Sequence, residues 1–159
     1  MIFAVRHPIE VRPAELRDLA SVSSMCHSLW PAASPDEHSG DMAPLLGGQA
    51  PGSLPAIVFL AEEPGGRAVG VLQTGLRSHA DGCDPSHPVG HIEGWYVAPD
   101  CRGRGIGARL VAAAEDWARR QGCAEMASDT WLDRLDSQRA HEALGYQVVD
   151  RRVNYRKPL

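Results

Sequence analysis

The residues best suited to chemistry lie in one stretch, HIEGWYVAPDCRGRGIGARLVAA, from His91 to Ala113. An alternating apolar run that contains the acid Glu93 leads into the turn RGRGIG, Arg102 to Gly107. Glycines let a backbone come close to a ligand, and a helix that starts after them offers unpaired N–H groups and a positive dipole end. Strand, basic turn and helix start together favour a phosphate or pyrophosphate site.

The turn taken alone has a second interpretation, because a flexible basic turn that only caps a helix would have the same composition. It is not a Walker A loop, since no GK[ST] follows, and it lacks the GxGxxG spacing of a dinucleotide-binding turn. Spacing by itself leaves the anion site and the capping turn both open.

Glu93 is the acid closest to this turn in the preceding strand. In a regular strand its side chain shares a face with those of Trp95 and Val97. Ile92 and Gly94 flank it, and an unpaired acid is costly to bury on such a strand. We therefore expect Glu93 to have a role in a site.

The elements that must position these residues follow from hydrophobic periodicity and turn signals. A helix is predicted after Pro13, with Leu16, Leu19, Val22 and Met25 at helical spacing, and a second one over Gly105–Gln121, with Ile106, Leu110, Val111, Ala114 and Trp117 on one face. A third covers Asp136–Leu144, closed by Gly145. The predicted strands are Ile9–Arg12, Ala56–Ala61, Ala68–Leu76, His91–Val97, Ala124–Ser128, Gln147–Asp150 and Arg152–Arg156. This order indicates a mixed α/β (α+β) fold rather than a regular doubly wound sheet.

The segment Pro31–Pro55 is rich in Pro, Gly, Ser and acids, and a short helix is expected only near Met42–Leu46. A loop of that length in a compact domain is usually a functional lid or a disordered segment.

Length and charge limit the alternatives. A chain of 159 residues is long enough for one core, so we expect a single domain over residues 1–159. A net charge of −4 disfavours nucleic acid as a partner and fits a cationic ligand better. Four scattered cysteines suggest neither zinc nor disulfides, and no signal peptide or membrane span is evident, so a soluble, cytoplasmic protein is expected.

The turn resembles the Gln/Arg-x-x-Gly-x-Gly/Ala motif of the GNAT superfamily of N-acetyltransferases, with Arg102, Gly105 and Gly107 on its fixed positions. The resemblance implies a mixed, mostly antiparallel twisted sheet, flanked by helices and splayed at an acetyl-CoA cleft. It implies acetyl-CoA as co-substrate, no metal, and polarisation of the thioester carbonyl by the Val97 amide. The implied coenzyme contacts are Trp95, Tyr96 and Val97 along the pantetheine arm, and Arg102, Gly103, Arg104, Gly105, Ile106 and Gly107 at the pyrophosphate.

Several further segments resemble the aminoglycoside 6'-N-acetyltransferases: SLWP, IEGWYVAPDCRGRGIG, GCAEMASDT, SQRAHEALGY and DRRVNYRKPL. This resemblance implies a polycationic amine as substrate, a homodimer, and substrate contacts at Trp30, Glu93, Asp129 and Asp150. It also implies that Glu93 is the base that takes the amine proton, directly or through a water. Each of the other three has an alternative: Trp30 could be core packing, Asp129 could cap the next turn, and Asp150 could pair with Arg151 or Arg152.

The sequence departs from that family at two named positions. Ala33 stands where a histidine is frequent, and Arg134 stands where an asparagine touches the coenzyme. His141 occupies the position of the tyrosine that protonates the departing thiolate in many GNAT enzymes, so it is the candidate acid, although a structural role is equally compatible. Two other functions stay open: acetylation of another small amine or a protein N-terminus, and a non-catalytic acetyl-CoA-binding module.

Overall fold

A computed structural model describes residues 8–159 and contains one five-stranded sheet in the order β1-β2-β3-β4-β5. The first four strands pair antiparallel, and β5 pairs parallel to β4. The strands are β1 (Glu10–Pro13), β2 (Ala56–Glu62), β3 (Ala68–Arg77), β4 (Val89–Val97) and β5 (Met126–Ser128). The prediction of a mixed, mostly antiparallel sheet is confirmed.

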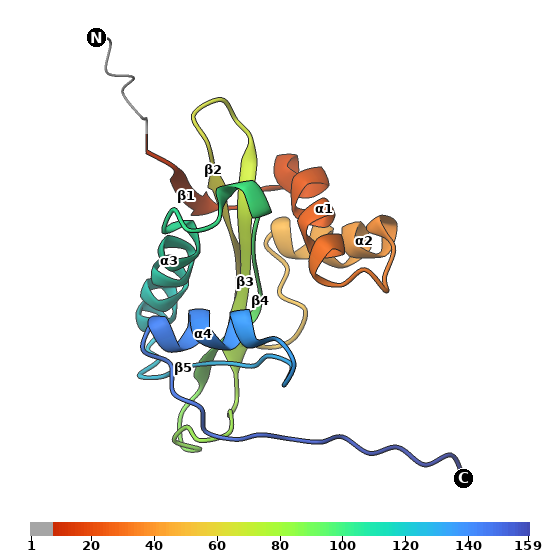
Figure 1. Cartoon of the computed structure of the whole chain (residues 1–159), viewed down its shortest axis with the longest axis vertical. Helices are drawn as coiled ribbons and strands as arrows, with labels where there is room; N and C mark the ends of the chain where they lie inside the picture. Colours follow the sequence, from red (N-terminus) through yellow and green to blue (C-terminus); the bar gives the residue numbers. More distant parts are fainter. Residues whose placement is uncertain (1–7) are drawn as a thin grey trace.

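Helices cover both faces of this sheet, as Figure 1 shows, with α3 on one side and α1 and α2 on the other. The short α4 lies across the end of the sheet near β5 (Figure 1). Their bounds are α1 (Leu19–Leu29), α2 (Pro35–Leu46), α3 (Ile106–Arg120) and α4 (Leu135–Ala143), with 3₁₀ turns at Leu16–Asp18 and Pro99–Cys101. None of the helices in the described part of the chain is both long and apolar enough to span a bilayer.

The predicted apolar face of α3 is buried, and it forms the larger of two core clusters against the sheet. The second cluster lies on the opposite face, beneath α1 and α2. Two layers of helix around one sheet thus bury both of its faces, and this holds the central strands β3 and β4 rigidly in place.

The helix in the segment predicted as a long loop is longer than expected: α2 spans Pro35–Leu46, whereas only a short helix near Met42–Leu46 was predicted. α2 starts at Pro35 because Ser34 and Glu37 form a capping box: Glu37 N–H donates to Ser34 Oγ, and Ser34 N–H donates to the Glu37 carboxylate. Pro35 fits the first helical position, where no N–H is needed. Met42 and Leu45 then pack into the cluster under α1.

The two strands predicted after α4 are absent, because residues 146–159 run in an irregular path. In Figure 1 this C-terminal segment passes the end of the sheet and leaves the body of the molecule. A strand needs a partner for its backbone N–H and C=O groups, and within the described chain this segment finds none. Its apolar side chains are exposed: Val148, Val149, Val153 and Tyr155.

Candidate active site

A β-bulge in β4 determines where the Glu93 side chain points. Thr74 of β3 pairs with Ile92, and Gln73 pairs with Gly94, so Glu93 has no partner residue on β3. Ile92 and Trp95 both pack toward the α3 face, which means that the alternation slips by one residue between them. Glu93 therefore lies on the opposite face, with Gly94, and the prediction that it shares a face with Trp95 and Val97 was wrong.

On that face, the Glu93 carboxylate is held by two side chains. Arg77, at the end of β3, donates Nε to Oε1 at 2.9 Å and Nη2 to Oε2 at 2.6 Å. Nδ1 of His91, a residue 3% exposed, lies 3.3 Å from Oε1 and has no other partner among the described residues. Burial works to raise the pKa of Glu93, but the contacts with His91 and Arg77 outweigh it and lower the pKa to about 2.

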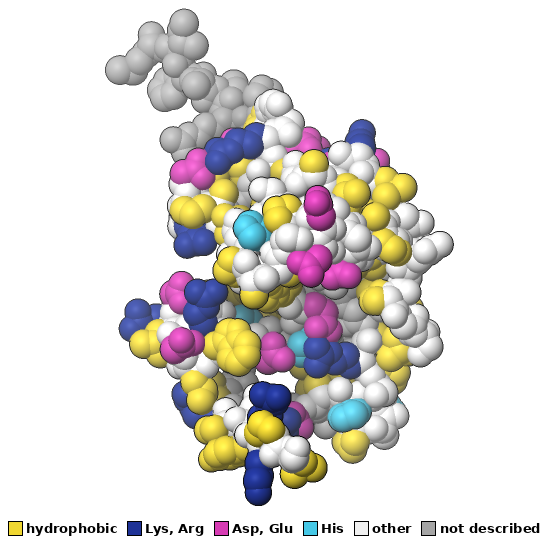
Figure 2. All heavy atoms as spheres, turned by 90° about the vertical axis from the view of Figure 1, so that its right-hand side faces the viewer, with side chains coloured by type: hydrophobic (Ala, Val, Ile, Leu, Met, Phe, Trp, Pro, Cys, Tyr) yellow, Lys and Arg dark blue, Asp and Glu magenta, His cyan; other side chains and the backbone are white. Residues whose placement is uncertain are grey.

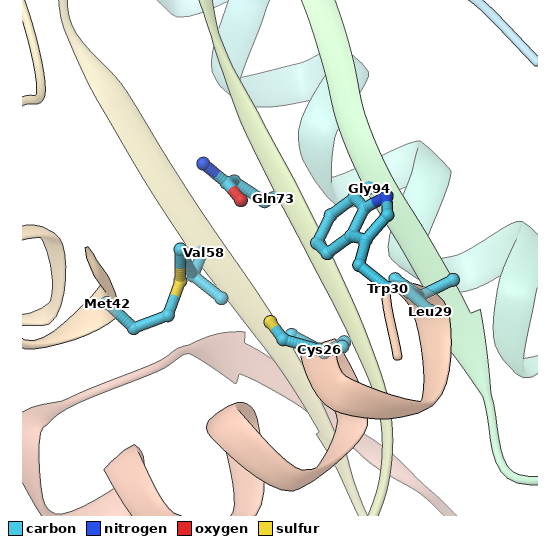
Figure 3. A pocket seen from close by; sticks show the side chains of 8 residues that line it. Cys26, Leu29, Trp30, Met42, Val58, Gln73 and Gly94 are labelled. Atoms are coloured by element: carbon cyan, nitrogen blue, oxygen red, sulfur yellow. The ribbon is translucent and has the colours of Figure 1, made fainter. Parts of the chain in front are cut away.

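Trp30 is brought to the same place, beside the bulge. Its indole sits over Gly94, where an added Cβ would come within 2.4 Å of Trp30 Cη2. Figure 3 shows the ring above β4, with Gln73, Cys26 and Met42 around the pocket beneath it. The residue Trp30 is 38% exposed, so part of its surface stays available to a ligand. Trp30 and Glu93, distant in sequence, thus form one site.

Substitution Gly94→Ala should weaken amine binding, because the new methyl group occupies the space of the Trp30 ring. Since the ring is partly exposed, it can swing outward with little loss of stability. We expect the KM for the amine to rise about 10-fold while the melting temperature changes by a few degrees at most. Steady-state kinetics with a thermal melt checks this, and an unchanged KM would contradict a contact between Trp30 and the substrate.

The glycine turn has the geometry of an anion cradle. Gly103 and Gly105 have φ of 73° and 75°, the left-handed region that favours glycine, and nothing crowds either residue. Gly105 precedes α3 and offers no side-chain cap, so the first N–H groups of that helix remain free. An added Cβ on Gly107 would lie 2.8 Å from Trp95 Cζ2, and this ties the start of α3 to β4. These features fit the pyrophosphate of coenzyme A.

The two arginines of the turn already have partners. Arg102 donates Nε to Val97 O at 3.0 Å, and its guanidinium carbon lies 5.9 Å from the centre of the Tyr96 ring. Arg104 reaches Glu63 Oε1 at 3.1 Å. Their charges nevertheless stay at the mouth of the cradle, because both residues are exposed.

The sheet splays beside this cradle. β4 pairs with β5 only from Gly90 to Ile92, so the edge of β4 beyond Ile92 has no strand next to it. Ala98 N–H donates to Val69 O on the β3 side at 2.8 Å. Because alternate residues of a strand direct their backbone groups to opposite edges, the Val97 N–H faces the open edge. An extended ligand arm can add there like a strand.

His141 lies on α4 at the inner end of the splay. Its Nδ1 lies 2.7 Å from Ser137 O, so Nδ1 carries the proton, and Nε2 accepts from Ser128 Oγ at 2.8 Å. Its ring meets those of Trp95 and Tyr146 edge-on, at 5.3 and 5.7 Å between centroids. His141 thus both packs and reaches the end of β5.

Two nearby groups have structural roles. Tyr146 donates its hydroxyl to Glu115 at 2.9 Å; burial and this bond raise the pKa of the phenol, as expected for a core residue rather than an acid. Cys101 is buried, with Sγ 3.6 Å from Arg104.

The remaining predicted residues lie on exposed segments. Asp129 directly follows β5, is exposed, and its charge helps to raise the pKa of Arg77, after the larger effect of the Glu93 hydrogen bond. Arg134 precedes α4 and is also exposed. Asp150 accepts from Arg152 Nε at 2.7 Å and from the Arg151 N–H, which is the pairing left open as its alternative.

Sequence reasoning missed three contacts of the site. Arg77 and His91 reach Glu93 only through the register of β3 and β4 and the bulge, neither of which has a local signal. His38 of α2 donates Nε2 to Trp30 O at 3.0 Å and fixes the end of α1. The capping box at Ser34 was the available signal for α2 and hence for His38.

Comparison with known proteins identifies the family of this chain. Residues 21–146 match the acetyltransferase (GNAT) family model. The aminoglycoside N(6')-acetyltransferase type 1 of Klebsiella aerogenes is 43% identical over 149 residues, 94% of this chain and 96% of that protein. The enzyme of the same name from Serratia marcescens is 41% identical over 133 residues, 83% and 87% of the two chains.

Solved structures indicate the same family. Aminoglycoside N-acetyltransferase AAC(6')-Iy in complex with coenzyme A has a TM-score of 0.86 at 32% identity, over 99% of this chain and 100% of that one. AAC(6')-Iy with the bisubstrate analogue CoA-S-monomethyl-acetylneamine has a TM-score of 0.84 at 32% identity, over 96% and 100%. The free amides before α3, the splayed β4 edge and these similarities lead to one conclusion: the chain belongs to the acetyltransferase (GNAT) family.

Proposed function

We propose that this protein is an aminoglycoside 6'-N-acetyltransferase, which transfers the acetyl group of acetyl-CoA to the 6'-amine of the drug and so confers resistance. The observation that carries the proposal is that Trp30 packs on Gly94, next to Glu93, while Asp129 follows Ser128, the β5 residue that pairs with Ile92 where the open edge of β4 begins. On the face seen in Figure 2, acidic side chains lie near basic and histidine side chains around a hollow. Carboxylates in a hollow suit a cation of several charges.

The free backbone N–H groups at the start of α3 and at the open edge of β4 support a coenzyme site on this side of the cleft. Acetyl-CoA supplies the activated acetyl thioester. Backbone N–H groups between Arg102 and Gly107 hold the pyrophosphate, and Trp95, Tyr96 and Val97 lie along the pantetheine arm. The Val97 N–H donates toward the thioester carbonyl and stabilises the charge that develops on its oxygen. Arg134, at the start of α4, is a further coenzyme contact.

On the amine side, we propose that Glu93 holds the reacting ammonium and takes its proton, directly or through a water. Asp129, and Asp150 from the C-terminal segment, hold neighbouring ammonium groups and so fix which amine meets the thioester. Trp30 supports a sugar ring with its exposed edge. The amine attacks directly, with both substrates bound.

His141 is the proposed donor to the departing thiolate: as an imidazolium it donates its Nε2 proton to Ser128 Oγ, while the Ser128 hydroxyl passes its own proton to the thiolate and His141 is left neutral. His141→Ala should lower kcat about 10-fold to 100-fold. His141→Gln, which keeps a side chain of similar size and can accept from Ser128, separates the lost proton from the lost packing against Trp95. A kcat–pH profile for both variants checks the role, and wild-type turnover of His141→Ala would remove it from the mechanism.

The test of the function is a coenzyme A release assay with three drugs. Kanamycin and tobramycin carry a 6'-amine, whereas paromomycin carries a hydroxyl at that carbon. We expect release with the first two and little with paromomycin. Equal activity on all three, or none on any, would overturn the regiochemical proposal and favour another small amine as substrate.

We further propose a homodimer that uses the C-terminal segment. Four exposed apolar side chains in 148–155 support this, because a chain alone gains nothing by leaving them in water. Light scattering should give about twice the 17.2 kDa of one chain, and Val153→Asp should lower that mass. A monomer at every concentration would contradict the proposal.

We also propose a cytoplasmic location. Cys26, Cys83, Cys101 and Cys123 are all free, as a reducing compartment would keep them.

A further inference from the structure

Arg77 occupies the carboxylate that the proposed function assigns to the substrate. Its two bonds to Glu93, of 2.9 and 2.6 Å, engage both oxygens in the fork geometry that arginine favours. His91 Nδ1 lies close to the oxygen that accepts from Arg77 Nε. Every oxygen of Glu93 thus has a cationic or potentially cationic neighbour before any amine arrives.

The charged and titratable groups at this point come from three strands. Arg77 belongs to β3, His91 and Glu93 to β4, and Asp129 follows β5, with its charge acting on Arg77. With His91 neutral, the cluster has two carboxylates and one guanidinium. Because Arg77 is 44% exposed, its guanidinium can leave Glu93 and be solvated without first being pulled out of a core.

Displacement of Arg77 from Glu93 by a substrate ammonium favours substrates with several positive charges. A single ammonium that displaces Arg77 replaces one cation by another at Glu93 and leaves the second carboxylate, Asp129, as it was. An amine with a second ammonium nearby also neutralises Asp129, so only this substrate gains an ion pair that the free protein lacks. The cost of displacing Arg77 from Glu93 is the same for both amines, and only the polycation offsets it by a second ion pair, at Asp129.

We propose that Arg77 is the exchangeable counter-ion of Glu93: it competes with the substrate ammonium for this carboxylate, so an amine with one charge gains no net ion pair by binding, whereas an amine with two neighbouring charges gains one. This inference rests on the proposed function and adds the group that the substrate must displace. Arg77 touches the residue that binds the substrate and takes no part in acetyl transfer itself.

The test compares kanamycin with methyl 6-amino-6-deoxyglucoside, one sugar ring with a single amine at the corresponding carbon. Calorimetric affinities for both are measured in the wild type, in Arg77→Met, which removes the charge and keeps an apolar stem, and in Arg77→Lys, which keeps it. The wild type should prefer kanamycin by at least 100-fold. Arg77→Met should tighten the binding of both amines about 10-fold and leave their ratio unchanged, because the competing cation is lost for both, and Arg77→Lys should keep the wild-type affinities.

The outcomes separate the two proposals. If the wild type binds kanamycin and Arg77→Met leaves both affinities unchanged, Arg77 does not compete for Glu93, while the proposed function stands. If Arg77→Met weakens both amines equally and Arg77→Lys restores both, Arg77 only positions Glu93, and the exchange is overturned. If the wild type binds neither amine, both proposals fail. A thermal melt of each variant identifies any that is unfolded.

Discussion

Replacement of Glu93 by glutamine is expected to lower kcat/KM for kanamycin about 10²-fold to 10³-fold. The variant keeps the shape of the side chain but loses the charge that holds the ammonium and the oxygen that takes its proton. In the free protein the Glu93 pKa is about 2, so the carboxylate stays ionised throughout the usual assay range. Any change of wild-type kcat/KM between pH 6 and 8 should therefore come from the titration of a group other than Glu93.

The pH profile separates a base from a mere binding group. If Glu93 takes the proton, kcat of Glu93→Gln should keep rising at high pH, where the wild type levels off, because hydroxide must then replace the base. Glu142→Gln, the same change at an exposed position of α4, is the matched control. An unchanged rate and an unchanged profile in Glu93→Gln would reject Glu93 as the base.

Stability gives an independent check on the ion pair at Glu93. The pKa of this carboxyl is lowered from its ordinary value of 4.5 to about 2 in the folded protein, so the pair stabilises the fold above about pH 4.5. That contribution is lost as the pH falls toward 2. Thermal melts of the wild type and Glu93→Gln should therefore differ at pH 7 and converge as the pH approaches 2. A difference that does not depend on pH would mean that Glu93 acts on stability by packing alone.

The helices and strands were predictable where a hydrophobic period and a terminal glycine or proline indicate the same element. The apolar face of α3 and the strands β2, β3 and β4 were predicted to within about two residues, because each combines a clear period with a glycine or proline at its end. The first helix was expected from Pro13, whereas Pro13 ends β1 and α1 begins at Leu19 after a 3₁₀ turn. Boundaries of this kind depend on hydrogen bonds that no local pattern specifies.

The site was predicted as a list of residues, and its geometry was not. Trp30 and Glu93 were identified as substrate contacts only through family resemblance, and the sequence could not indicate that Gly94 lets the indole lie beside the acid. The bulge at Glu93 is the clearest case: it changes the face of a catalytic candidate, yet it arises from the β3–β4 register across a long loop. The prediction of two C-terminal strands failed for a related reason, because an alternating sequence does not by itself supply a partner strand.

Gly107→Ala should raise the KM for acetyl-CoA about 10-fold to 100-fold with a smaller change in the KM for the amine. The added methyl group would lie 2.8 Å from Trp95 Cζ2, and the half-buried indole, packed against His141, has little freedom to move. The start of α3 must shift instead, and its free amides shift with it. Gly40→Ala in α2, where nothing lies within 4 Å, controls for loss of a helical glycine. Calorimetry with coenzyme A alone measures the effect, and unchanged affinity would contradict the pyrophosphate assignment. Because Gly107 belongs to the glycine turn and Trp95 to the open edge of β4, this one contact would keep the two parts of the proposed coenzyme site in register.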